Sequence, residues 1–293
     1  MNAGKTIDTL DDQAALKFMH DIQLEALAAV PQAFRAIADA ARAVAETISN
    51  SGRIIYCGAG SSGLIALQDG AELPGTFGTD PEQIVFLIAG GLENADNLLG
   101  SVEDDSNVAR NTVHALRVVQ KDLIIAISAS GSTPYTLAAA DAGKRRGTKV
   151  IGIANKPQSP LLDLADIPIC IPTPSEAVTG STRMAAGTVQ KCVLGLISTL
   201  AHTRLGHVYR GEMVNLRPDN EKLRVRAVDI VSRVVGIPRA DAQQVLELAD
   251  NRVKDAILLA SGARSPAHAQ DLLTETEGHL SSALDRLKND PNL

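Results

Sequence analysis

Hydroxyl side chains are concentrated in one short segment, residues 128–133, directly before a proline and directly after the apolar run at 122–127. The four hydroxyl residues are Ser128, Ser130, Ser132 and Thr133. Hydroxyl and backbone N–H groups at the start of a helix can together hold the oxygens of a phosphate without a metal ion. A helix cap needs only one hydroxyl, so four of them favour a phosphate-binding loop over a simple cap.

A second candidate loop has the sequence Gly-Ala-Gly-Ser-Ser-Gly at residues 58–63 and follows the β-prone run at 53–57. Glycines let the backbone turn sharply and approach a ligand, and the start of the next helix suits an anion. The spacing also fits the dinucleotide-binding pattern Gly-x-Gly-x-x-Gly. A lone match of that kind is weak, and the second predicted strand lacks a clear acidic end. We therefore favour an anion site here too.

Both loops end short apolar runs that alternate with helical patterns. The predicted strands lie at 53–57, 84–89, 122–127, 149–154 and 167–171, with helices at about 62–72, 108–119 and 134–146 between them. Wholly apolar strands alternating with helices indicate a parallel sheet covered on both faces, an α/β doubly wound fold. Its ligand site is expected at the carboxyl ends of the strands, where both loops fall.

The two ends of the chain are helical in pattern. Residues 11–49 predict two helices broken near Pro31, and the segment from 181 to 205 predicts a long buried helix. We expect three parts: N-terminal helices at 1–50 packing on the core, an α/β domain at 51–219, and a small helical domain at 220–293.

Composition excludes several classes of function. The net charge is −6 and aromatic residues make up 2 %, which argues against nucleic acid and against stacking surfaces. The three cysteines form no zinc pattern, and neither a signal peptide nor a membrane span is expected. We expect a cytoplasmic protein without a cofactor or metal.

Several motifs together resemble a known family. Ser-x-Ser-Gly-x-Thr after a strand, with Gly-x-Gly-Ser-Ser upstream, is similar to the sugar isomerase (SIS) phosphosugar-binding domain. Further stretches resemble the N-acetylmuramic acid 6-phosphate etherase family. They are residues 71–74 (Ala-Glu-Leu-Pro), 87–91 (Leu-Ile-Ala-Gly-Gly), 102–104 (Val-Glu-Asp), 178–191 (from Val-Thr-Gly-Ser-Thr-Arg-Met to Gln-Lys) and 220–223 (Asn-Glu-Lys-Leu).

The resemblance implies a lyase that releases D-lactate from the sugar 6-phosphate, with Glu72 as the acid at the leaving oxygen and Glu103 as the base at C2. Two carboxyl groups can share this work only when their environments push their pKa values apart. Glu72 lies near the end of a predicted helix, where a negative charge opposes the dipole. Glu103 lies in an acidic cluster, and such clusters are usually solvated loops.

The resemblance also assigns ligand contacts. Ser128, Ser130 and Thr133 are expected to hold the 6-phosphate, with Ser132 in the same loop, and Ser61 and Ser62 to face the sugar. Arg183 is a further anion contact, although a surface arginine is an equal alternative. The chain departs from the family at three positions where the family has a cation: Leu64, Ser132 and Ala185.

About ten helical residues, roughly 15 Å, separate Ser62 from Glu72. A single sugar phosphate hardly spans that distance, so we expect a composite site in which Glu72 works beside the second loop or a neighbouring subunit of a homodimer. Two alternatives stay open: another phosphosugar isomerase or lyase, and a non-catalytic phosphosugar-sensing regulator.

Overall fold

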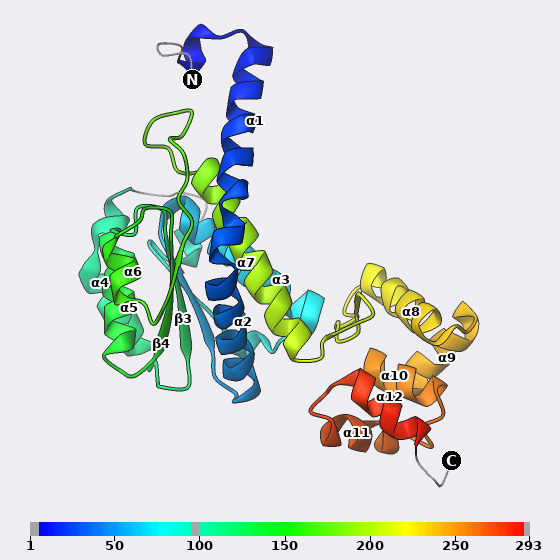
Figure 1. Ribbon diagram of the computed structural model, residues 1–293. Helices are drawn as coiled ribbons and strands as arrows, with labels where there is room; N and C mark the ends of the chain where they lie inside the picture. Colours follow the sequence, from blue (N-terminus) through cyan, green and yellow to red (C-terminus); the bar gives the residue numbers. More distant parts are fainter. Residues whose placement is uncertain (1–5, 95–99, 290–293) are drawn as a thin grey trace. The chain divides into compact units, whose positions relative to one another are not determined.

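The computed structural model describes residues 6–94 and 100–289. Its contacts divide the chain into two compact units (Figure 1). Unit 1 comprises residues 1–71 and 82–198, and unit 2 comprises residues 72–81 and 199–293. Helices α3 and α7 each contribute residues to both units.

Unit 1 is built on a five-stranded sheet in which all neighbouring strands are parallel, in the order β2-β1-β3-β4-β5. The strands are β1 (Ile54–Gly58), β2 (Ile84–Ile88), β3 (Leu123–Ser128), β4 (Lys149–Ala154) and β5 (Ile167–Cys170). Every residue of β1 and β3 is buried, as expected for strands covered on both faces. The predicted doubly wound α/β fold is confirmed.

Helices cover both faces of this sheet. Those of unit 1 are α1 (Asp12–Ala28), α2 (Phe34–Ser49), α4 (Ser106–Ala115), α5 (Pro134–Lys144) and α6 (Pro160–Leu164), with parts of α3 (Gly60–Phe77) and α7 (Ala185–Arg204). Figure 1 shows α4, α5 and α6 on one face of the sheet and α2 on the other. Short 3-10 turns link these elements at Ile7–Thr9 (η1), Val30–Ala33 (η2), Pro81–Gln83 (η3), Leu92–Asn94 (η4) and Gly100–Asp104 (η5).

The face under α4 and α5 is a tightly packed apolar layer. Alternate residues of β1 and β3, such as Ile55 and Ile124, pack there against α4 through Ala109 and against α5 through Ala139. The break between α1 and α2 falls at η2, which contains Pro31, as the sequence predicts. This layer fixes the carboxyl ends of the strands, from which both candidate loops emerge.

Helix α3 is longer than the sequence predicts. We expected it to end at about Glu72 because of Pro74 and Gly75, but it continues through Pro74 to Phe77. An internal proline loses one backbone hydrogen bond and typically costs about 3 kcal/mol. Burial of Leu73 and Phe77 on this last turn offsets that cost, and the Phe77 ring stacks on His202 with centroids 4.3 Å apart.

Unit 2 is mainly helical. Its helices are α8 (Glu221–Val235), α9 (Arg239–Leu248), α10 (Val253–Ala260), α11 (Pro266–Glu275) and α12 (Leu280–Lys288), and a small hairpin is formed by β6 (Val208–Tyr209) and β7 (Glu212–Met213). Asn220 caps α8 by accepting a hydrogen bond from the N–H of Leu223, and Gly236 ends it with a left-handed backbone. Within the described ranges, no helix is long and apolar enough to cross a membrane.

Candidate functional site

The second loop brings its four hydroxyl groups together. The Oγ of Ser128 lies 2.8 Å from Oγ1 of Thr133 and 3.4 Å from Oγ of Ser130, and the Ser132 hydroxyl donates to Ser130 Oγ at 2.9 Å. The N–H of Gly131 donates to Ser128 Oγ at 3.1 Å. The serine at the end of β3 is buried, whereas Ser130 and Ser132 are exposed. The loop is therefore an ordered hydroxyl cluster open to solvent on one side.

Thr133 is the N-cap residue of α5, yet its side chain makes no capping hydrogen bond. Its hydroxyl pairs with Ser128 instead, and Pro134 occupies the first helical turn. The first N–H groups of a helix have no partner within the helix, so here they are left without a side-chain cap from Thr133. This arrangement favours an anion at the start of α5 over the simple helix-cap alternative.

Backbone hydrogen bonds from the segment that follows β4 and from α6 hold the loop in place. The N–H of Asn155 donates to Ala129 O at 3.0 Å, and the N–H of Leu161 donates to Gly131 O at 2.9 Å. Gly131 has a φ of +64°, and a Cβ on it would meet Ser159 Oγ at 2.1 Å. Only glycine fits this position.

Asn155 also anchors a buried amide pair that the sequence analysis missed. Its Nδ2 donates to Ile171 O at 3.1 Å, and Gln190 Nε2 donates to its Oδ1 at 2.9 Å. Both side chains are buried. The place of Asn155, directly after β4 at the carboxyl end of the sheet, is the signal that could have found it.

The first loop leaves the neighbouring strand at the same edge of the sheet. Gly58 of β1 is opposite Ile127 of β3, so residues 58–63 and 128–133 emerge side by side. Helix α3 begins at Gly60, which puts Ser61 and Ser62 in its first turn, half-buried and buried respectively. Two serine-containing helix starts therefore adjoin each other at the carboxyl edge, where the sequence predicts the ligand.

Glu103 lies against the first loop. It belongs to η5, and its Oε1 would be 2.5 Å from a Cβ added to Gly60, whose φ is +53°. The carboxylate thus occupies the space that any other residue at position 60 would fill. Glu103 is half-buried rather than part of a fully exposed acidic loop, although Asp104 and Asp105 beside it are exposed.

Glu72 belongs to a different unit from the serine loops, and among the described residues Arg183 forms no hydrogen bond or ion pair with either loop. Glu72 is an exposed residue of α3 that belongs to unit 2, whereas Glu103 and the serines belong to unit 1. Arg183 is exposed on the segment before α7. The expected partnership of the two glutamates therefore stays a prediction.

Known proteins resemble the chain over nearly its whole length. A SIS domain model matches residues 17–155. The N-acetylmuramic acid 6-phosphate etherase of Photorhabdus laumondii is 37 % identical over 98 % of this chain and 95 % of its own, and that of Streptomyces coelicolor is 38 % identical over 95 % of this chain and 89 % of its own. The chain belongs to the N-acetylmuramic acid 6-phosphate etherase family.

Solved structures agree with the etherase family assignment at the level of fold. A phosphoheptose isomerase from Francisella tularensis has a TM-score of 0.50 and 21 % identity, and the match covers 65 % of this chain and all of that one. A likeness of that size shows the shared α/β architecture alone.

The three positions where the chain lacks the family's expected cations differ in surroundings. Leu64 and Ser132 are exposed, and Ala185 is fully buried at the start of α7. Glu176 accepts hydrogen bonds from the N–H groups of Ala185 and Ala186 at 3.0 and 3.1 Å. This carboxylate, which the sequence analysis missed, occupies the α7 N-terminus, so that helix start is already filled by an anion of the chain itself.

Proposed function

We propose that the chain is an etherase that cleaves the D-lactyl ether of N-acetylmuramic acid 6-phosphate to N-acetylglucosamine 6-phosphate and D-lactate. The observation that carries this proposal is the identity of 34–38 % to etherases over at least 95 % of the chain. The adjoining serine loops, with Glu103 against one of them, supply groups of the type that such a reaction needs.

Phosphate binding is the part of the proposal that the second loop supports. The hydroxyls of Ser128, Ser130, Ser132 and Thr133 and the α5 N-terminus hold the 6-phosphate, and Ser61 and Ser62 face the sugar ring. Neutral hydroxyls and N–H groups suit a phosphate because its oxygens accept several hydrogen bonds at once. This cluster needs no metal ion to do so.

The chemistry is an elimination followed by addition of water. In the open-chain aldehyde, the Glu103 carboxylate removes the C2 proton, which the carbonyl acidifies. The C3–O bond to lactate breaks as the protonated Glu72 gives its proton to the leaving oxygen. Water then adds to C3 and loses a proton to Glu72, and Glu103 returns its proton to C2. Over the cycle both carboxyl groups recover their starting state, and one water is consumed.

Glu72 supplies the acid in this scheme. We propose a homodimer with a composite site, working in the cytoplasm on a small sugar phosphate and not on nucleic acid. Light scattering tests the assembly, since a monomeric particle with full activity would contradict a site that needs two subunits. Arg183 is proposed to pair with the lactyl carboxylate.

Release of D-lactate tests the activity. Purified protein incubated with N-acetylmuramic acid 6-phosphate should form D-lactate and N-acetylglucosamine 6-phosphate in equal amounts. No lactate above background from folded protein would reject the proposal. Exchange of the C2 proton with deuterated water, without lactate, would instead favour an isomerase, and binding without exchange would favour a phosphosugar sensor.

Substitution of Glu103 tests its assigned role. Glu103→Gln should lower kcat by at least about 100-fold, because a general base contributes about 10²- to 10⁴-fold. The matched control is Asp104→Asn, which removes a neighbouring exposed carboxylate and should leave kcat within about twofold of the parent. Glu72→Gln should behave like Glu103→Gln. Full activity in either glutamine variant would show that its role is assigned wrongly.

A further inference from the structure

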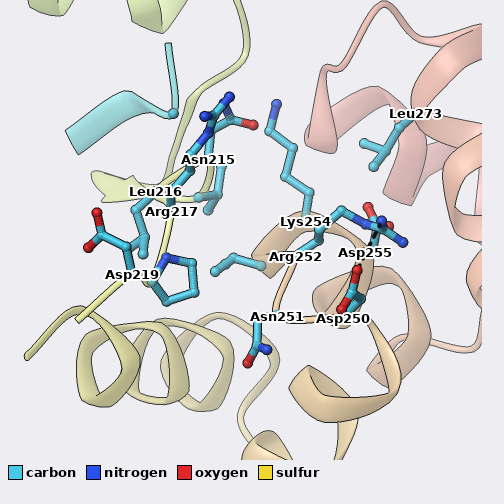
Figure 2. A pocket seen from close by; sticks show the side chains of 14 residues that line it. Asn215, Leu216, Arg217, Asp219, Asp250, Asn251, Arg252, Lys254, Asp255 and Leu273 are labelled. Atoms are coloured by element: carbon cyan, nitrogen blue, oxygen red, sulfur yellow. Dashed lines mark hydrogen bonds and ion pairs between the residues drawn. The ribbon is translucent and has the colours of Figure 1, made fainter. Parts of the chain in front are cut away.

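Unit 2 contains a cavity of its own, with a volume of about 530 Å³. Its walls come from the segment before α8, the start of α10 and the turn that precedes it, with Gly78 and Leu273 (Figure 2). All of these residues belong to unit 2. Nothing in the proposed etherase mechanism uses this cavity.

A buried lysine lines the cavity. Lys254, on α10, is 8 % exposed, and its Nζ donates one hydrogen bond, to Gly278 O at 2.8 Å. Burial lowers the pKa of Lys254 to about 8, so the side chain is still mostly an ammonium at pH 7. An ammonium has three N–H donors, and within residues 6–94 and 100–289 the Gly278 carbonyl is its one hydrogen-bond partner.

The acidic residues of the cavity form hydrogen bonds or ion pairs with groups other than Lys254. Asp255 accepts hydrogen bonds from Arg252 Nε at 2.6 Å and from Gln270 Nε2. Asp250 Oδ2 lies 3.8 Å from Arg252 Nη1. Asp219 is exposed and accepts from the side chain of Asn220. In the described part of the chain, Lys254 therefore forms no salt bridge with a carboxylate.

The histidines near Lys254 do not supply negative charge. The pKa of His207 is lowered to about 3, first by burial and then by the positive charges of Lys254, His202 and His279. Burial disfavours the Lys254 ammonium more than the nearby charge of Asp255 favours it, and a bound anion would offset that cost.

A second cation of the cavity, Arg217, forms no salt bridge with a described carboxylate either. Arg217, on the segment before α8, is exposed and forms no side-chain hydrogen bond or ion pair with any described residue. Figure 2 shows Arg217 and Lys254 lining the same pocket, together with the amides Asn215 and Asn251. Guanidinium and ammonium groups are the donors that proteins use most for phosphate.

We propose that this cavity is an anion site that binds a phosphate group, free or carried by a small metabolite, through Lys254 and Arg217. Its residues belong to unit 2, whereas the serine loops belong to unit 1, and the proposal does not depend on the proposed etherase activity. It gives unit 2 a ligand of its own.

Titration calorimetry with inorganic phosphate on the full chain tests the proposal. The Ser128→Ala/Ser130→Ala double variant serves as background, because it removes the main hydroxyls of the other phosphate loop. Phosphate should still bind to this background with one site per chain. Adding Lys254→Gln should weaken that binding at least tenfold, and adding Arg217→Gln should weaken it by about three- to tenfold.

Lys222→Gln is the matched control, because it removes an exposed lysine of α8 outside the cavity, and it should leave phosphate binding unchanged. Since Arg217 is exposed, its variant should fold even if the Lys254 variant does not. Two results would overturn the proposal. One is that the Ser128→Ala/Ser130→Ala variant binds no phosphate, and the other is that adding Arg217→Gln to this variant leaves its affinity for phosphate unchanged. Repeating the titration with N-acetylglucosamine 6-phosphate distinguishes a metabolite from free phosphate by its tighter binding.

Discussion

At the scale of single residues, the contact between Gly60 and Glu103 links backbone conformation to proposed catalysis. Gly60→Ala places a methyl group where the Glu103 carboxylate lies, at a φ of +53° that alanine tolerates poorly. We expect the substitution to lower kcat by more than about tenfold, since small displacements of a catalytic group have large effects. The measurement is D-lactate release under saturating substrate.

The matched control lies on the same helix. Gly75 has no neighbour within 4 Å of an added Cβ, so Gly75→Ala should keep full activity. Equal activity of the two alanine variants would mean that Glu103 does not need this space.

Lys254 has a cost to stability that depends on pH. Its pKa is about 8 when folded, against an ordinary 10.5. Below pH 8 the folded protein carries the full cost of the desolvated charge, and this cost fades as pH rises from 8 to 10.5. We expect Lys254→Met to raise the free energy of unfolding by about 2 kcal/mol at pH 7.

Urea unfolding at pH 7 and pH 10 would measure this effect. The gain from Lys254→Met should shrink at the higher pH. A loss of stability at pH 7 would show that the hydrogen bond to Gly278 O outweighs the cost of the buried charge.

At the scale of elements, one ion pair ties together the starts of β1 and β3. The side chain of Asp122, which is fully buried, accepts hydrogen bonds from Arg53 N at 3.0 Å, Arg53 Nη2 at 2.6 Å and Val119 N at 3.0 Å. Asp122→Ala leaves the Arg53 charge and these donors without a partner. The expected loss is about 3 kcal/mol in the free energy of unfolding, measured by urea denaturation.

The exposed pair of Asp39 and Arg42 on α2 offers the comparison. Asp39→Ala should cost less than about 0.5 kcal/mol, because solvent screens exposed pairs. Similar losses in both variants would mean that burial of Asp122 adds nothing.

The strands of unit 1 could be predicted from the sequence, because short apolar runs such as residues 149–154 and 122–127 are typical of buried strands. Prediction from the sequence failed at the end of α3, where tertiary burial of Phe77 outweighed the local signal of Pro74. The contact between Glu103 and Gly60 could not be predicted from the sequence. That contact joins residues far apart in the chain and depends on how η5 packs.

At the scale of the whole molecule, the contacts divide the chain at residues other than those at which its composition changes. Composition suggested a helical domain that begins at residue 220, whereas the contacts group residues 72–81 and 199–219 with the C-terminal helices. The end of α3 and the hairpin β6–β7 carry no compositional break that would reveal this grouping. Membership of a unit is decided by long-range packing, such as Asn215 donating to Phe77 O at 2.7 Å.

Unit 2 should be sensitive to acid through His207. Its pKa falls to about 3 on folding from an ordinary 6.5, so between these values the unfolded chain binds the extra proton. Stability is therefore fully present above pH 6.5 and is lost as pH falls toward 3, by roughly 2 kcal/mol or more. Urea unfolding followed across this range should show the decline.

His207→Leu should flatten that decline, whereas His20→Gln, at an exposed position of α1, should not change it. An unchanged pH profile in the His207 variant would assign acid sensitivity to other groups.

The hydroxyl cluster of residues 128–133 has a further consequence, for the effect of ionic strength. That loop offers neutral donors, with Ser132 where relatives of this family are expected to have arginine. Salt screens attractions between full charges, but it hardly weakens hydrogen bonds from hydroxyls. Phosphate held by this loop should therefore be retained at salt concentrations that release it from the pocket of Lys254 and Arg217. Added sodium chloride thus offers a way to tell the two sites apart without changing a residue.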